Sequence, residues 1–229
     1  MIPVADAKRI SAIVPAYNEE SRIGMTLGAL KGLGLIDEIV VVDDASKDNT
    51  AGIARAHQVV VYTLPENCGK GGALTWGAAR VSGDIIALLD ADLGETAAEA
   101  EKLIRPVLAG EADMTIARFP PARRKGGFGL VKGLAGRGIK MLGGLEAHSP
   151  LSGQRAMTRE VMERVLPFAS GYGVEVGLTV RVARMGYRIT EVPVNMTHNE
   201  TGRDLKGFLH RGRQFWHVAR ELVTAALKK

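Results

Sequence analysis

Short apolar runs alternate with segments of helical spacing through the first half of this chain. We expect strands over residues 10–14, 38–42, 59–63, 84–89 and 113–117, and helices over residues 18–30 (capped by Asn18), 46–56, 69–81 and 96–108. Strand–helix–strand units of this kind are right-handed and keep their strands parallel. The alternation therefore predicts an α/β fold, Rossmann-like, with a mostly parallel central sheet flanked by helices. With 46% hydrophobic residues among 229, the chain can bury the core that such a sheet needs.

The second half is less regular. Residues 119–144 are rich in glycine and basic side chains, which indicates a loop with a loose helix near residues 130–142. A strand is expected within residues 151–157, a helix over 173–185 and a long amphipathic helix over 205–227. The strand expected over 189–196 contains Pro193, and proline is confined mainly to edge strands.

Two carboxylates, Asp90 and Asp92, follow the apolar run at residues 85–89. Their spacing places both on one side of the chain as it leaves the strand. Close carboxylates raise each other's pKa unless a cation lies between them. Mg²⁺ and Mn²⁺ prefer oxygen ligands and commonly bind one or two carboxylates plus a substrate phosphate. The pair therefore predicts a metal and a phosphorylated substrate, the alternative being a solvated pair that caps the next helix.

Other polar segments follow neighbouring strands. Residues 15–19 come after the first strand and Asp43-Asp44-Ala45-Ser46 after the second. Ligands of parallel sheets bind beyond the carboxyl ends of the strands, so we expect these segments to share one rim with Asp90 and Asp92. The alternative for Asp43 and Asp44 is a turn followed by a helix cap.

Gly69-Lys70-Gly71 opens a predicted helix. Backbone N–H groups and a lysine at a helix N-terminus attract phosphate, although a simple turn would also explain the glycines. The spacing is not that of a P-loop, so an ATPase is not supported.

The basic residues are concentrated in the second half. The net charge is +5, and residues 119–148 hold six Lys or Arg against one acid, Glu146. Such an excess suits phosphates, anionic lipid or nucleic acid as partners. No known nucleic-acid-binding motif is present, so nucleic acid is not expected as a partner. The helix over 205–227 fits an interfacial helix on an anionic membrane, or alternatively a helix packed on the domain or in a homodimer.

The compartment is predicted from what the sequence lacks. Cys68 is the single cysteine, and with no Cys/His cluster a zinc site is not expected. No secretory signal and no membrane-spanning apolar run are visible. We therefore expect a cytoplasmic protein. If its terminal helix lies on an anionic membrane, the protein would be peripheral at the inner face of the cell membrane.

Four ordered motifs carry a resemblance to a known family. They are Pro15-Ala16-Tyr17-Asn18-Glu19-Glu20, residues 41–50, Asn67-Cys68-Gly69-Lys70-Gly71 and Asp90-Ala91-Asp92. Together they resemble family 2 glycosyltransferases of the GT-A fold, most clearly over residues 10–92. The resemblance implies a single GT-A domain over residues 1–229, with a nucleotide-binding half (1–118), an acceptor-side half (119–204) and a C-terminal helix (205–229).

The resemblance also implies a nucleotide-sugar donor, a UDP-sugar first of all, and Mg²⁺ or Mn²⁺. Asp92 is the expected direct metal ligand, with Asp90 on the ribose, the metal or a metal-bound water. A late histidine completes the metal site in glucosyl-3-phosphoglycerate-synthase-like enzymes, and His198 resembles it; a surface histidine is the alternative. Arg203 would clamp the pyrophosphate unless it lies on a solvated face. The remaining donor-binding residues carried over are Pro15, Ala16, Tyr17, Glu19, Asp43, Gly69, Lys70 and Ala91.

The acceptor side carries a second, shorter resemblance. Residues 151–156 resemble a Ser-Gly-aromatic-Arg-Ala stretch of dolichyl-phosphate-mannose-synthase-like enzymes, with Gln154 in place of the aromatic residue. Arg155 would bind an acceptor phosphate or form a structural salt bridge. Glu175 would act as general base toward a hydroxyl acceptor, or is an acid favoured by the helix dipole.

The resulting hypothesis is a metal-dependent glycosyltransferase that acts on a polyprenyl phosphate or another lipid. One alternative keeps the donor and transfers to a soluble phosphorylated acceptor, as glucosyl-3-phosphoglycerate-synthase-like enzymes do. Two others are a nucleotidyltransferase, disfavoured because the chain does not begin with a Gly-rich loop carrying Arg and Lys, and a non-catalytic nucleotide-binding module. Stereochemistry stays open, since family 2 implies inversion and the synthase resemblance implies retention.

Overall fold

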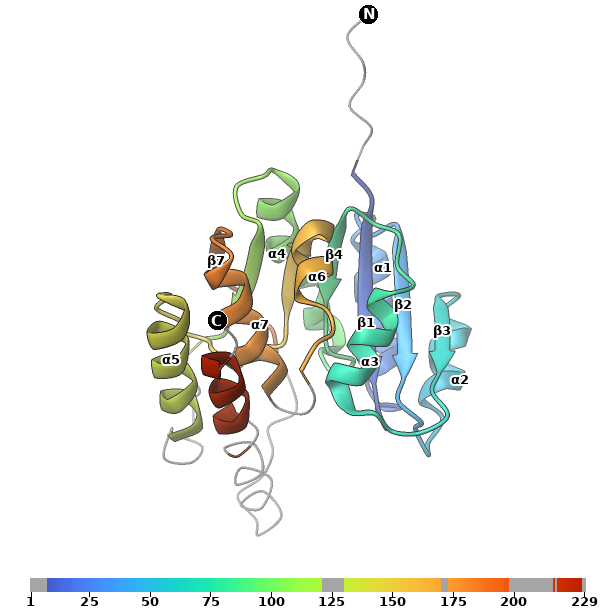
Figure 1. Cartoon of the computed structure of the whole chain (residues 1–229). Coiled ribbons are helices and arrows are strands. Elements are labelled where there is room, and N and C mark those ends of the chain that lie inside the picture. The colour runs from blue at the N-terminus through green and yellow to red at the C-terminus, as the bar shows by residue number, and fades with distance from the viewer. Residues whose placement is uncertain (1–7, 121–129, 170–172, 198–215, 217, 228–229) are drawn as a thin grey trace, which may run out of the picture.

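A seven-stranded sheet organises the chain in a computed structural model that describes residues 8–120, 130–169, 173–197, 216 and 218–227. The strand order is β3-β2-β1-β4-β6-β5-β7 (Figure 1). The strands are β1 (Ile10–Ala16), β2 (Glu38–Asp43), β3 (Val60–Thr63), β4 (Ile85–Leu88), β5 (Met114–Arg118), β6 (Arg155–Thr158) and β7 (Ile189–Pro193). The helices are α1 (Ile23–Gly32), α2 (Thr50–Ala56), α3 (Gly69–Ala78), the 3-10 helix η1 (Gly94–Glu99), α4 (Ala100–Leu108), α5 (Leu130–Gly143), α6 (Arg159–Val165) and α7 (Val174–Arg184).

The parallel half of the sheet confirms the predicted alternation. Strands β3, β2, β1 and β4 run parallel, and the five strands predicted in the first half each lie within two residues of an observed one. Ala16 pairs with Asp43 at the ends of β1 and β2. The carboxyl ends of these strands therefore form one rim, as expected.

Strand β6 is the exception to parallel order. It runs antiparallel to both β4 and β5, so Arg155 at its start pairs with Leu88 at the end of β4. The residues that enter β6 therefore reach the same rim as the residues that leave β4. Strand β7 pairs with β5 at the sheet edge and ends at Pro193, which agrees with the edge position predicted from that proline.

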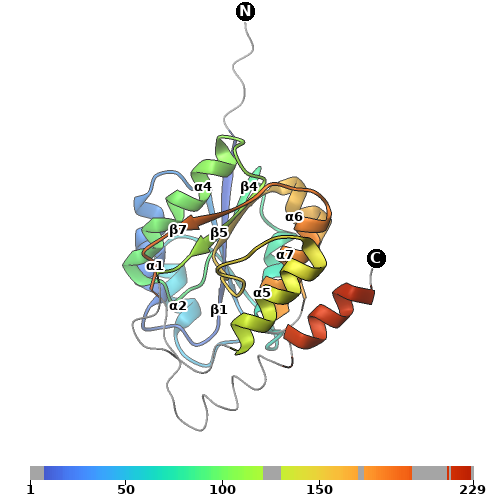
Figure 2. The ribbon, with the colours of Figure 1, turned by 90° about the vertical axis from the view of Figure 1, so that its left-hand side faces the viewer.

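Helices cover both faces of the sheet. Figure 2 separates α1, α2 and α4 on one face from α6 and α7 on the other. The side chains of β1 alternate between the two cores: Ile10, Ala12, Val14 and Ala16 pack under α1, η1 and α4, whereas Ile13 packs under α3, α6 and α7. This alternation of faces is the period of a strand buried on both sides.

The start of one helix was predicted wrongly, and another helix was not predicted. Asn18 does not cap a helix: its φ is 56°, its Oδ1 accepts a hydrogen bond from the Lys47 N–H at 2.8 Å, and α1 begins only at Ile23. Helix α6 was not predicted, because it follows β6 without a loop. Thr158 begins it, since its side chain accepts a hydrogen bond from the Val161 N–H at 3.3 Å.

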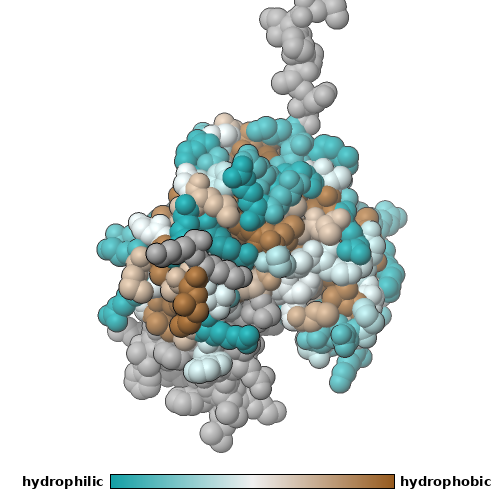
Figure 3. Space-filling view, viewed as in Figure 1, coloured by the Kyte–Doolittle hydropathy of each residue, from teal (hydrophilic) through white to brown (hydrophobic). Residues whose placement is uncertain are grey.

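Helix α5 and the helical residues 218–227 form a third layer, which packs on α7. Its shared core includes Ile139, Val180, Val218 and Leu222. The described part of the terminal helix thus packs on the domain, which was one predicted alternative. Its outer face carries Val223 at 59% and Leu227 at 80% exposure, and Figure 3 shows hydrophobic side chains gathered there. Within the described ranges, no helix is long and apolar enough to cross a membrane.

Candidate functional site

Three adjoining cavities lie along the rim. The first has a volume of about 370 Å³, and eight of its ten lining residues were predicted donor or metal residues. It shares Lys70 and Asp90 with a second cavity of about 210 Å³, which in turn shares Phe119, Leu151 and Ser152 with a third of about 730 Å³. The first cavity is lined by Pro15, Ala16, Tyr17, Glu19, Asp44, Lys70, Ala73, Asp90, Ala91 and Asp92.

Helix α1 holds the loop that carries the paired aspartates. The Thr26 hydroxyl donates to the Ala91 carbonyl at 2.8 Å and accepts from the Gly94 N–H at 2.8 Å. The guanidinium of Arg22 donates to the Asp92 carbonyl at 3.2 Å. The backbone of residues 91–94 is thus fixed, and the carboxylates of Asp90 and Asp92 can face the first cavity.

The carboxyl group of Glu19 lies in the field of these two aspartates. Burial, followed by repulsion from Asp92 and then Asp90, raises the pKa of Glu19 from 4.5 to about 7. Three acids that repel one another are a donor set that a divalent cation would stabilise.

The described residues supply only part of a metal site. Among them, no cluster of three or more His, Cys, Asp or Glu side chains is placed to hold an ion. The predicted third ligand, His198, and the predicted clamp, Arg203, lie outside the described residues. Mg²⁺ normally completes its shell with substrate phosphate and water, so Asp92 with its neighbours fits an ion that arrives with a diphosphate.

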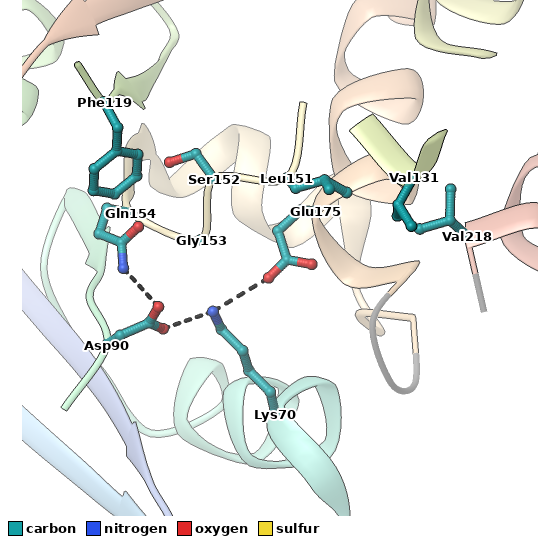
Figure 4. A pocket seen from close by; sticks show the side chains of 10 residues that line it. All are labelled: Lys70, Asp90, Phe119, Val131, Leu151, Ser152, Gly153, Gln154, Glu175 and Val218. Carbon is teal, nitrogen blue, oxygen red and sulfur yellow. Dashed lines mark hydrogen bonds and ion pairs between the residues drawn. The ribbon is translucent and has the colours of Figure 1, made fainter. Parts of the chain in front are cut away.

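Asp90 belongs to a network that joins the first two cavities (Figure 4). Its Oδ1 lies 2.6 Å from the Lys70 Nζ, and its Oδ2 accepts a hydrogen bond from the Gln154 Nε2 at 2.6 Å. Both carboxylate oxygens of Asp90 therefore already have a partner on the chain. Gln154 reaches Asp90 because β6 runs antiparallel to β4.

Lys70 also contacts Glu175, at 3.2 Å between Nζ and Oε1. Burial would lower the pKa of Lys70, but attraction to Asp90 and Glu175 outweighs it and raises that pKa above its ordinary value. Lys70 is thus an ammonium between two carboxylates. Glu175 lies in the first turn of α7 and lines the second cavity with its side chain 12% exposed.

Arg155 is placed differently from the phosphate-binding role expected for it. It is 1% exposed and lines none of the three cavities. Its guanidinium donates to the carbonyls of Ser152 (3.1 Å) and Glu175 (2.9 Å) and to the Thr179 hydroxyl (2.9 Å). Burial lowers the pKa of Arg155 to about 10. This placement favours the structural alternative. The contacts that hold Arg155 are hydrogen bonds, whereas that alternative predicted a salt bridge.

The second strand presents Asp44, where Asp43 was expected. Asp44 lines the first cavity, and its Oδ1 accepts from the Cys68 N–H at 2.7 Å. Asp43 is 1% exposed and its Oδ1 accepts from the Ser46 N–H at 3.3 Å, as in the predicted turn. Asp43 lines none of the three cavities, and the sequence alone did not show which of the two neighbours would line one.

The glycines beside Lys70 have backbone reasons. Gly69 has a φ of +72°, a conformation that favours glycine, and a Cβ at Gly71 would collide with the Ala169 carbonyl oxygen. Neither glycine lines the described cavities, whereas Lys70 lines two of them. Lys70 is therefore the member of this motif that faces the first two cavities.

Comparison with known proteins gives a consistent result. The model of the family described as Glycosyl transferase family 2 matches residues 11–166. A glucosyl-3-phosphoglycerate synthase of Mycolicibacterium smegmatis is 32% identical over 207 residues, which cover 76% of this chain and 63% of that protein. The undecaprenyl-phosphate mannosyltransferase of Micrococcus luteus is 29% identical over 213 residues, which cover 85% of this chain and 86% of that protein.

Solved structures agree with these sequence relatives. The glucosyl-3-phosphoglycerate synthase of Mycobacterium tuberculosis, in complex with Mn²⁺, uridine diphosphate and phosphoglyceric acid, superposes with a TM-score of 0.80 at 30% identity. The match covers 95% of this chain and 78% of that chain. The chain thus spans less than two thirds of the M. smegmatis synthase, but most of the mannosyltransferase.

Proposed function

This chain belongs to glycosyl transferase family 2, and from that premise we propose that it transfers a sugar from a UDP-sugar with Mg²⁺ or Mn²⁺ as cofactor. The observation that carries the proposal is the convergence of Glu19, Asp90 and Asp92 at one cavity on the rim. Solved complexes of a relative contain Mn²⁺ or Mg²⁺ with uridine diphosphate, which supports both the nucleotide and the ion.

The donor's nucleoside lies in the first cavity in this proposal. Pro15, Ala16 and Tyr17 form its floor, and Glu19 accepts hydrogen bonds from the ribose hydroxyls. Asp43 remains the proposed acceptor for the uracil imide. Asp44 is a second candidate, because it is the member of the pair that lines the cavity.

The diphosphate lies between Asp92 and Lys70. Asp92 would hold the ion together with His198, and Arg203 would clamp the pyrophosphate, as the family resemblance implies. The ion, when bound, neutralises charge that grows on the departing nucleoside diphosphate. Lys70 is a cation that lines this cavity and supplies a second positive charge to the same group. Asp90 positions Lys70 through their 2.6 Å contact.

The proposed acceptor is a polyprenyl phosphate or another lipid at the membrane surface. The near full-length match to an undecaprenyl-phosphate mannosyltransferase supports it, as does the basic second half of the chain. A phosphate nucleophile is already an anion and needs no base. Glu175 would then position Lys70, whereas toward a hydroxyl it would accept the proton.

A soluble phosphorylated acceptor is the second candidate. It is favoured by the superposition with a synthase complex that contains phosphoglyceric acid. The two candidates share the donor site and differ only in what enters the second and third cavities.

The donor proposal is tested by thermal shift. We expect UDP to raise the melting temperature of the wild type only with Mn²⁺, and to have no such effect on Asp92→Ala. Glu146→Gln is the matched control, because Glu146 is an exposed acid whose partner is Lys140. An Asp92→Ala protein that binds UDP with Mn²⁺ as the wild type does would refute the metal assignment.

Product analysis separates the remaining alternatives. UDP release with undecaprenyl phosphate supports the lipid acceptor, and release with 3-phosphoglycerate supports the soluble one. Pyrophosphate release would indicate a nucleotidyltransferase. Nucleotide binding that does not depend on Mn²⁺, with no product released, would indicate a non-catalytic nucleotide-binding module.

A further inference from the structure

Gln154 presents a buried amide to the second cavity. The residue is 2% exposed and lies directly before β6. Its backbone carbonyl accepts a hydrogen bond from the Ala117 N–H of β5 at 3.0 Å. The neighbouring strand therefore fixes the backbone of Gln154 at the wall of this cavity.

The carboxylate of Asp90 dictates the orientation of the Gln154 amide. The Gln154 Nε2 lies 2.6 Å from the Asp90 Oδ2. An ionised carboxylate only accepts hydrogen bonds, so the nitrogen of the amide must face Asp90 and the oxygen must face the other way. Figure 4 shows the nitrogen turned toward Asp90 and the oxygen turned away from it. No residue that the structure describes donates a hydrogen bond to this oxygen.

The free amide oxygen selects the kind of ligand group that can lie opposite it. An amide oxygen only accepts hydrogen bonds, so a hydroxyl can pair with it, whereas the oxygens of an ionised phosphate have no proton to donate. Buried polar groups are nearly always hydrogen-bonded, and leaving one unpaired costs free energy. Gln154 therefore favours a ligand that carries hydroxyl groups over a phosphate or a lipid chain at this position.

Gly153 brings the loop of Gln154 against the Lys70–Asp90 pair. A Cβ at Gly153 would collide with the Lys70 Nζ and would lie 3.2 Å from the Asp90 Oδ2, so only glycine allows the loop to come this close. Lys70 and Asp90 line both the first and the second cavity. Gln154 thus lies next to the two residues at which these cavities adjoin.

The donor's sugar is the hydroxyl-bearing group that would reach this point. In the proposed function the diphosphate lies between Asp92 and Lys70, and the sugar is bonded to its terminal phosphate. The second cavity, with a volume of about 210 Å³, is the space that adjoins Lys70 on the other side. Small-molecule pockets usually have about 300–1,000 Å³, so a cavity of this size suits a single ring. The acceptor would approach from the third cavity, which meets the second at Phe119, Leu151 and Ser152.

We propose that Gln154 determines the donor specificity of this transferase, with its Oε1 accepting a hydrogen bond from one hydroxyl of the sugar in the second cavity. The inference rests on the proposed function, because it takes the diphosphate as lying between Asp92 and Lys70. Asp90 is a positioning residue in this arrangement, since it fixes which end of the amide faces the sugar. A sugar that lacks this hydroxyl leaves the amide oxygen unpaired and binds more weakly.

Calorimetric titration of the full chain with Mn²⁺ tests the assignment. The probes are UDP and whichever of UDP-glucose and UDP-galactose binds the wild type more tightly. In Gln154→Met a thioether replaces the amide, and we expect this variant to bind the sugar nucleotide roughly tenfold more weakly but UDP as the wild type does. Gln154→Asn withdraws the amide by one methylene and should show the same selective loss. The melting temperature of each variant shows that it is folded.

Gln58→Met is the matched control, because Gln58 is an exposed glutamine that lines none of the three cavities. It should bind both probes as the wild type does. The assignment is overturned if Gln154→Met keeps the wild-type affinity for the sugar nucleotide. It is also overturned if the affinity for UDP falls by the same factor, because the amide would then support only Lys70 and Asp90.

Deoxyfluoro analogues of the sugar nucleotide identify the hydroxyl, since fluorine donates no hydrogen bond. We expect one replacement to weaken binding to the wild type roughly tenfold and to leave binding to Gln154→Met unchanged. Equal losses in the two proteins at every hydroxyl would refute the assignment. A wild type that binds UDP but neither sugar nucleotide would refute this inference alone, whereas a wild type that does not bind UDP with Mn²⁺ would refute the donor site of the proposed function and this inference with it.

Discussion

Replacing Lys70 with methionine removes the ammonium that lies between Asp90 and Glu175. Its Nζ is 2.6 Å from one carboxylate and 3.2 Å from the other, and their side chains are 29% and 12% exposed. The variant leaves two half-buried carboxylates without their shared cation. Asp90 keeps its hydrogen bond from Gln154, so the damage falls mainly on Glu175.

The size of the effect follows from this partial burial. Breaking a fully buried ion pair costs roughly 3–5 kcal/mol, whereas exposed pairs contribute about 0–1 kcal/mol. The Lys70 side chain is 30% exposed, so we expect Lys70→Met to lower the free energy of unfolding by about 2 kcal/mol at pH 8. For a chain of this length that corresponds to a fall in Tm of roughly 4–8 °C.

The pH dependence identifies the cause. Without the ammonium, the two carboxylates repel each other across the second cavity, and this repulsion acts only while both of them are charged. We expect the deficit, measured by urea denaturation, to be larger at pH 8 than at pH 5.

Two further variants serve as controls. Adding Glu175→Gln to Lys70→Met should recover part of the loss, because one of the two stranded charges is removed. Lys102→Met breaks a more exposed pair with Glu99, at 49% and 24% exposure, and should cost less than about 1 kcal/mol. A Lys70→Met deficit that is independent of pH, or that Glu175→Gln deepens, would refute the reasoning.

Two other predictions concern stability. Glu19 has a folded pKa of about 7 against 4.5 unfolded, so its charged form destabilises the fold increasingly as the pH rises through that window. Glu19→Gln should therefore raise the free energy of unfolding by about 1–2 kcal/mol at pH 8 and have little effect at pH 4.5. Urea denaturation at both pH values measures the difference. Equal effects at both pH values would contradict this. A Cβ at Gly138 would collide with the side chain of Leu222, so Gly138→Ala should cost about 1–3 kcal/mol and speed hydrogen exchange in residues 218–227. Gly133→Ala on the same helix meets open space and should stabilise it by up to about 1 kcal/mol; identical behaviour of the two variants would argue against the packing described.

The sequence predicted the parallel half of the fold well because its strands are buried on both faces. A strand such as β4 (Ile85–Leu88) is a continuous apolar run, and its end is marked by Asp90. Parallel strands then bring their carboxyl ends together without further information. The convergence of Tyr17, Asp90 and Asp92 at one cavity follows from that rule.

The acceptor side depended on contacts that the sequence does not display. An apolar run does not encode strand direction, so the antiparallel course of β6, and with it the contact of Gln154 with Asp90, was not predictable. The burial of Arg155 likewise depends on α7 lying over it, where the Glu175 carbonyl and the Thr179 hydroxyl accept hydrogen bonds from its guanidinium. Asp43 and Asp44 are neighbours in the sequence, and only the structure shows that Asp44 is the one that lines the first cavity.

The short ladder between β4 and β6 joins the two halves of the sheet. Strand β5 pairs only with β6 and β7 among the described strands, so the sheet passes from one half of the protein to the other through four residue pairs. Asp90 follows β4 and Gln154 precedes β6, and a 2.6 Å hydrogen bond joins their side chains. The second cavity is therefore lined from both halves of the sheet, by Asp90 from one half and by Gln154 from the other.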